Sequence, residues 1–103
     1  MKQYKYTIYK QDGTIEDLGI GEKKNFQDFY TILNCQMIEH IPHDYYPDKS
    51  GHAEFWGDEE ARFDSMNIRN PHFKVLKGNP DLGEAEEWDI VGDIIKEEVA
   101  RIE

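Results

Sequence analysis

Polar and apolar side chains alternate at the start of the chain. Tyr4, Tyr6 and Ile8 share one face of residues 2–9, which is the two-residue period of a half-buried strand. Residues 11–13 (Gln-Asp-Gly) are a turn signal because Gly13 can adopt a positive φ. Residues 14–20 return as a second strand that Gly19 weakens. The pattern predicts an N-terminal β-hairpin.

A helical period follows the hairpin. Asn25 is a suitable N-cap, and apolar residues then recur at the spacing of an amphipathic helix that ends near Asn34 and Cys35. These apolar residues are Phe26, Phe29, Tyr30, Ile32 and Leu33. The pattern predicts one main helix.

The middle of the chain predicts further strands. Residues 37–46 look extended, and Pro42 places them at a sheet edge or a bulge. A turn at residues 47–51 leads to alternation over residues 52–56, and a second turn closes that strand at 57–60. Residues 61–66 fit neither period.

The last third of the chain is less regular. Residues 73–76 indicate a short strand or a buried bridge, and residues 77–87, with two Gly and one Pro among acids, indicate an exposed loop. The apolar residues of 88–103 fit both a helix and a strand buried on both faces; we favour a strand over 89–96, broken at Gly92, and a short helical tail. We therefore expect one α+β domain over residues 1–103, a small antiparallel sheet with an N-terminal hairpin and one main packed helix.

Composition adds a strong negative charge to this domain. The chain has 22 acidic against 12 basic residues, a formal net charge of −10, and the part from Glu54 onward carries most of the excess. Such a charge disfavours nucleic acid as a direct partner and favours basic surfaces. No apolar run approaches a membrane span of about 20 residues, no signal peptide is visible, and Cys35 is alone. These features predict a cytoplasmic protein with no membrane partner.

Several short motifs follow one another in a recognisable order: a helix at 26–34, a strand at 37–40, the turn 58–61 (Asp-Glu-Glu-Ala) and the segment 90–93 (Ile-Val-Gly-Asp). Phe63 follows the turn, and Asn67 or Asn70 lies downstream. This order resembles a family of small phage- and plasmid-borne domains of unassigned function. The resemblance covers about two-thirds of the chain and implies an α+β domain from a mobile element, with no enzyme activity. Accessory proteins of that origin often antagonise host defence.

The acidic residues are the first candidate site. Duplex DNA shows one negative charge per about 1.7 Å of axis, so carboxylates on a rigid scaffold can occupy the basic groove of a nucleic-acid enzyme. We expect a non-enzymatic DNA mimic that binds and inhibits a host nucleic-acid-handling defence protein; the same acids would also serve solubility alone. The expected contacts are Asp58, Glu59, Glu60, Asp64, Glu84, Glu86, Glu87, Asp89 and Asp93, with Glu97 and Glu98 on the same acidic face and Trp56 and Trp88 as apolar anchors. A second copy of the chain is a further partner that the sequence leaves open.

A polar-aromatic stretch is the alternative site. Aromatic faces, amides and a guanidinium group are what a pocket for a nucleotide-like molecule needs, so the chain would act as a sponge for a signalling nucleotide. The residues of this alternative are Tyr45, Tyr46, Asn67, Arg69, Asn70 and His72. The absence of a Gly-rich phosphate loop and the negative charge speak against it.

Other constellations carry less chemistry. His40, His43 and His52 lie close in sequence, but an odd spacing on an extended strand would point His40 and His43 to opposite faces unless Pro42 bulges the strand. Cys35 follows a helix, where the dipole does not favour a thiolate. We therefore expect no catalytic residue, no cofactor and no bound metal.

Overall fold

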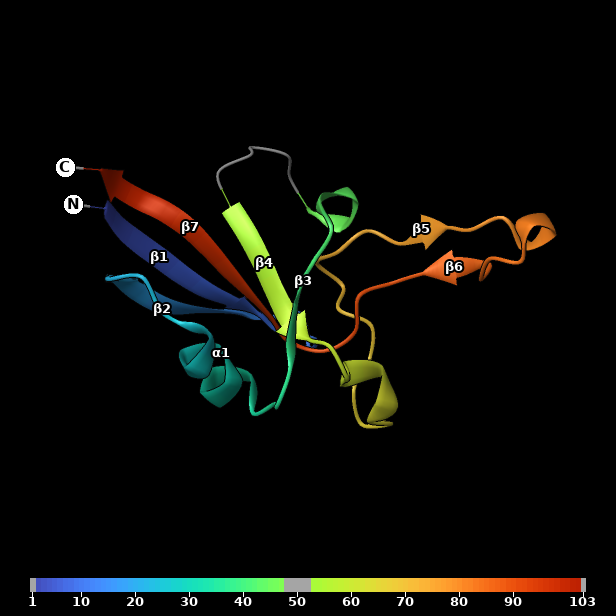
Figure 1. Ribbon diagram of the computed structural model, residues 1–103, viewed down its shortest axis with the longest axis horizontal. Coiled ribbons are helices and arrows are strands. Elements are labelled where there is room, and N and C mark those ends of the chain that lie inside the picture. The colour runs from blue at the N-terminus through green and yellow to red at the C-terminus, as the bar shows by residue number, and fades with distance from the viewer. Residues whose placement is uncertain (1, 48–52, 103) are drawn as a thin grey trace.

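The structure, a computed structural model, describes residues 2–47 and 53–102, with only the backbone of residues 101 and 102. Five antiparallel strands form one sheet in the order β2-β1-β7-β4-β3, and β5 and β6 form a separate two-stranded hairpin (Figure 1). The elements are β1 Lys2–Tyr9, β2 Ile15–Gly21, α1 Phe26–Leu33, β3 Ile38–His40, η1 His43–Tyr45, β4 Ala53–Asp58, η2 Ala61–Phe63, β5 Leu76–Lys77, η3 Pro80–Leu82, β6 Glu87–Trp88 and β7 Ile94–Ile102. The predicted α+β class is confirmed.

The N-terminal hairpin is confirmed as β1 paired with β2. Its register shifts after Tyr6, which faces Gly19, while Thr7 faces Asp17. Leu18 is therefore the extra residue of a bulge, and Gly19 closes the bulge at φ +87°, a conformation that other residues rarely adopt.

The C-terminal strand β7 is the centre of the sheet, because it pairs with β1 on one side and β4 on the other. The predicted helical tail is wrong: β7 continues to Ile102, which faces Lys2 of β1. The predicted strand start at Asp89 is also too early. Gly92 at φ +85° breaks the chain just before Ile94, as expected. Pairing with β1 outweighs the helical spacing of the apolar residues.

Helix α1 covers one face of the sheet. Asn25 caps it as predicted, in a capping box with Asp28, and Asn34 ends it in the left-handed conformation. Phe29 of this helix is buried against Tyr6 of β1 and Ile95 of β7. Burial of one such side chain stabilises the fold by about 1.5–3 kcal/mol, so this face is one half of the core.

The other face carries the second half of the core. Its buried residues are Ile41, Tyr46, Ala53, Phe55, Phe73, Ile90 and Ile94. Asn70 is fully buried and ties the covering segment to the sheet, since its Nδ2 donates to the carbonyls of Tyr9 at 2.7 Å and Gly92 at 2.9 Å. These bonds satisfy a polar side chain that would otherwise be costly to bury.

The segment 77–87 is exposed, as predicted, but a two-stranded hairpin at its ends makes it a short arm that extends away from the sheet (Figure 1). Leu76 faces Trp88 and Lys77 faces Glu87 across β5 and β6, with η3 between the strands. Gly78 permits the close approach: a Cβ there would lie 1.9 Å from the carbonyl oxygen of Ala85. Sequence reasoning missed this hairpin because each of its strands has only two residues.

A buried hydrogen bond links the two sides of the central pair β1 and β7. The Tyr6 hydroxyl donates to Glu97 Oε2 at 2.6 Å and accepts from the Lys24 amide at 2.8 Å. Burial and the bond to Glu97 raise the pKa of Tyr6, so the hydroxyl stays protonated. Glu97 is only 7% exposed and needs this donor.

We predict that Tyr6→Phe lowers the free energy of unfolding by about 1–3 kcal/mol, because it leaves the buried Glu97 carboxylate without its donor. Urea denaturation measures this. Tyr4→Phe is the matched control and should cost much less. In Tyr6→Phe/Glu97→Gln the two losses should not add, because both remove the same bond; simple additivity would contradict the coupling.

Candidate functional site

Five acidic residues gather where β4 ends, and we call them the acidic cluster: Glu39, Asp58, Glu59, Glu60 and Asp64. Burial raises the pKa of Glu39 above its usual value, and the negative charges of Glu59 and Asp58 raise it further against the opposing Arg62. The carboxylates of Glu39, Asp58 and Glu59 are therefore close enough for Glu39 to be repelled by the other two.

The backbone holds the acidic cluster in place. Asp58 Oδ1 accepts from the Glu60 amide at 2.8 Å, and the Glu59 amide donates to the Met37 carbonyl at 3.0 Å. Asp64 Oδ1 accepts from the Met66 amide at 2.9 Å. Asp58 and Asp64 thus close their own turns with their side chains, and a backbone bond fixes the position of Glu59.

Two large apolar side chains project beside the acidic cluster. Phe63, the last residue of η2, is 87% exposed, and Met66 is 82% exposed. Such exposure on neighbouring residues is typical of a contact surface. Sequence reasoning missed both as anchors, because residues 61–66 fit neither a helical nor a strand period.

The tryptophans predicted as anchors differ from one another. Trp56 is partly buried, with its ring 5.4 Å from that of Phe26 and 4.9 Å from that of His40. It therefore packs between α1 and β3 and is not a free anchor. Trp88 is 43% exposed on β6.

The predicted acidic contacts do not form one patch. Glu84, Glu86 and Glu87 are exposed on the arm, apart from the acidic cluster (Figure 1). Asp89, at the base of the arm, is paired with Arg62 at 2.9 Å. Asp93 accepts from the Gln11 amide at 2.9 Å and so has a structural role.

Two acidic residues of β7, Glu97 and Glu98, were also predicted to lie on the acidic face, and the structure places them differently. Glu97 is buried against Tyr6, which corrects its placement among the surface acids. Glu98 is 3.6 Å from the Lys96 ammonium group. Glu97 and Glu98 differ because successive side chains of a strand point to opposite faces, and both faces of the central strand β7 are covered.

The residues of the alternative nucleotide pocket use their polar atoms inside the protein. Asn67 Nδ2 donates to the Ala61 carbonyl, Arg69 donates to the Phe73 carbonyl, and Asn70 is fully buried. The ring of His72 packs 5.0 Å from that of Tyr9. Tyr46 is buried and Tyr45 half-buried beside the core. The guanidinium fork and the amides are thus engaged in holding the loop.

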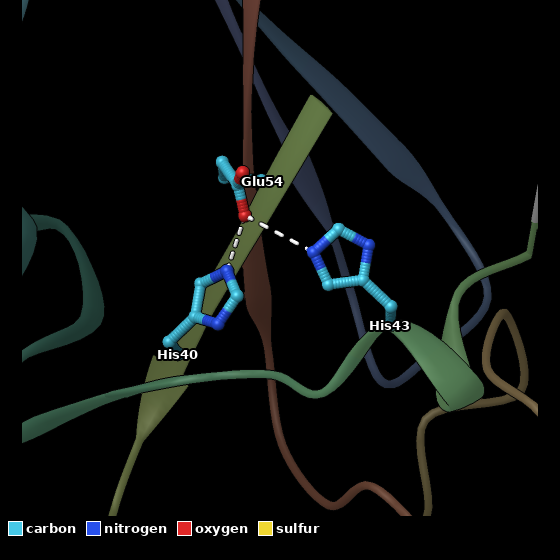
Figure 2. Close-up of side chains that lie close together, drawn as sticks. All are labelled: His40, His43 and Glu54. Atoms are coloured by element: carbon cyan, nitrogen blue, oxygen red, sulfur yellow. Dashed lines mark hydrogen bonds and ion pairs between the residues drawn. The ribbon is translucent and has the colours of Figure 1, made fainter. Parts of the chain in front are cut away.

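Histidines 40 and 43 lie together, contrary to the expectation of opposite faces (Figure 2). The extended segment ends at His40, and after Pro42 the chain turns into the 3-10 helix η1, which starts at His43. Both imidazoles face Glu54 of β4: His40 Nε2 is hydrogen-bonded to Glu54 Oε2, and His43 Nε2 is 3.8 Å from it. The predicted His52 lies outside the described residues.

Tyr46 supports this group from the core. Its hydroxyl accepts from the Phe55 amide at 3.2 Å and donates to Glu54 Oε2 at 3.3 Å, so it takes the place of a strand partner at the free edge of β4. Burial raises the pKa of Tyr46 to about 12, which keeps the hydroxyl a donor. The hydrogen bond with His40 lowers the pKa of Glu54 below its usual value.

Comparison of the chain with protein-family models, curated proteins and solved structures gives no match. The resemblance to phage- and plasmid-borne domains therefore stays a prediction. Within the described residues, the helices are too short or too polar to cross a membrane.

We predict that Cys35 reports the field of the acidic cluster. Burial raises the pKa of its thiol above the usual 9.0, and the charge of Asp58 raises it further. Only the thiolate reacts with an alkylating reagent, so the alkylation rate should keep rising above pH 9. Asp58→Asn should lower the pKa and speed alkylation at pH 8, while Glu86→Gln, the same charge change on the arm, should not. Equal rates in both variants would contradict the local field.

Proposed function

We propose that this protein is a non-enzymatic inhibitor that binds the basic surface of a nucleic-acid-handling protein in the cytoplasm of a host cell. The observation that carries the proposal is the acidic cluster, in which the carboxylates of Asp58 and Glu59 act on Glu39, followed closely in the chain by the exposed Phe63. Clustered carboxylates on a rigid backbone suit a groove that binds phosphates.

The electrostatics favour an encounter with a basic surface. The net charge of −10 steers association with a cationic groove, and salt weakens this steering because screening acts over about 8 Å at physiological ionic strength. Within the described part of the chain, Glu59 and Glu60 form no ion pair. Their charges are thus available to lysines and arginines of a partner.

The apolar side chains supply what charge alone does not. Interface energy concentrates in a few large side chains whose contacts exclude water. Phe63 and Met66 lie within a few residues of Glu59, Glu60 and Asp64. A partner would cover the two apolar side chains while its basic groups meet the surrounding carboxylates.

The test is binding to a panel of purified bacterial nucleases and helicases with basic clefts, in competition with duplex DNA. We expect at least one member to bind, to lose affinity as salt rises, and to lose nuclease or helicase activity. Glu59→Gln/Glu60→Gln should weaken that binding at least tenfold, about 1.4 kcal/mol, and Phe63→Ala should weaken it similarly.

The matched control is Glu22→Gln/Asp44→Asn, which removes two exposed charges elsewhere and leaves the net charge equal to that of the first variant. It should bind as the parent does. Equal loss in both double variants would mean that only net charge matters. Salt-insensitive binding, or no binding to any member of the panel, would also overturn the proposal.

A further inference from the structure

Three metal-ligating side chains meet at the sheet edge where β3 ends (Figure 2). One ligand atom from each of His40, His43 and Glu54 lies within 4.8 Å of the other two. We propose that this cluster binds one divalent transition-metal ion, with Zn²⁺ the best fit. Two imidazole nitrogens and one carboxylate oxygen form a donor set that such ions prefer.

The geometry needs little adjustment to hold an ion. Ligand atoms about 2.0–2.1 Å from a tetrahedral zinc are about 3.3 Å apart, and His43 Nε2 is already 3.8 Å from Glu54 Oε2. Small rotations of the side chains suffice. The hydrogen bond between His40 Nε2 and Glu54 Oε2 would be replaced by a bond from each atom to the ion, because the ion binds neutral imidazole and ionised carboxylate.

The positions of the ligands are set by the fold. His40 faces Trp56 across the β3–β4 pair, so Glu54, two residues before Trp56, is its diagonal neighbour on the same face. Pro42 and η1 then bring His43 back over the same edge. The β3–β4 pairing and the turn at Pro42 thus bring the three ligand side chains together.

Packing and hydrogen bonds orient the ligand side chains further. The ring of His43 stacks on that of Tyr46 at 4.6 Å, and the ring of His40 lies against Trp56. The Tyr46 hydroxyl donates to the Glu54 carboxylate at 3.3 Å. Outer contacts of this kind typically change metal affinity by about 10–100-fold.

The charge around the site favours a cation. Glu54 lies directly opposite the buried Glu97 in the pairing of β4 with β7, and like charges in such a pair are destabilising. A bound cation would relieve this repulsion. The side chains of His40, His43 and Glu54 are 38%, 61% and 45% exposed, so an ion can enter and a fourth position stays open to water.

The experiment is calorimetric titration of the metal-free, untagged full chain with ZnCl₂. We expect one ion per chain, and an affinity at least about tenfold lower in each of His40→Ala, His43→Ala and Glu54→Gln. Glu39→Gln is the matched control: it removes a carboxylate from the same strand but on the other face, and should bind Zn²⁺ as the parent does. Zn²⁺ should also raise the unfolding midpoint, and EDTA should reverse this.

The decisive variant is His43→Ala, because an imidazole 61% exposed can be removed without disturbing the core. On the unmodified chain, nitrogen NMR should show Zn²⁺ shifting the ring signals of His40 and His43 together and leaving that of His72 unchanged. No binding at millimolar Zn²⁺, unchanged affinity in His43→Ala, or loss of binding in Glu39→Gln would overturn the site. The acidic-cluster variant Glu59→Gln/Glu60→Gln should retain Zn²⁺ binding, so this proposal and the inhibitor proposal fail separately.

Discussion

The short pairing of β3 with β4 is the constraint on which both candidate sites depend. Three residue pairs form it: Ile38 with Asp58, Glu39 with Gly57, and His40 with Trp56. Because successive side chains of a strand point to opposite faces, Glu39 points to one face, where it senses the charge of Glu59, while His40 meets Glu54 on the other. A shift of one residue would exchange these two side chains and dissolve both sites.

The centre of the sheet keeps this register in place. β7 lies between β1 and β4, and Tyr6 satisfies the buried Glu97 across the first of these pairs. On the far side of β4 only three residues of β3 continue the pairing, so the chain leaves the edge at Pro42. The Tyr46 hydroxyl then accepts from the buried Phe55 amide, which lies beyond the last β3–β4 residue pair, and Glu54 remains accessible to the two histidines. The cluster of His40, His43 and Glu54 thus forms because β3 pairs with only part of β4 and the Tyr46 side chain bonds the next amide of β4.

The sequence predicted those elements that depend on interactions between residues close together in the chain. The Asn25 cap, the N-terminal hairpin and the break at Gly92 each rest on neighbouring residues, and the structure confirms them. The full length of β7 could not be predicted, because its helical spacing is overruled by pairing with β1 about 90 positions away. The convergence of His43 with Glu54 depends on a turn at Pro42 and on a strand pair, neither of which a periodicity reveals. The sequence shows that acidic residues are abundant. Which of them lie in the acidic cluster, on the β5–β6 arm or, like Glu97, in the core depends on the topology of the sheet.

The most direct test of this arrangement is a crystal structure grown with Zn²⁺ and measured at the zinc absorption edge. The β3–β4 register predicts one strong anomalous peak within bonding distance of His40 Nε2, His43 Nε2 and the Glu54 carboxylate, with Glu39 on the opposite face of the strand. A peak among the carboxylates of the acidic cluster alone, or a strand in which Glu39 and His40 have exchanged faces, would contradict it.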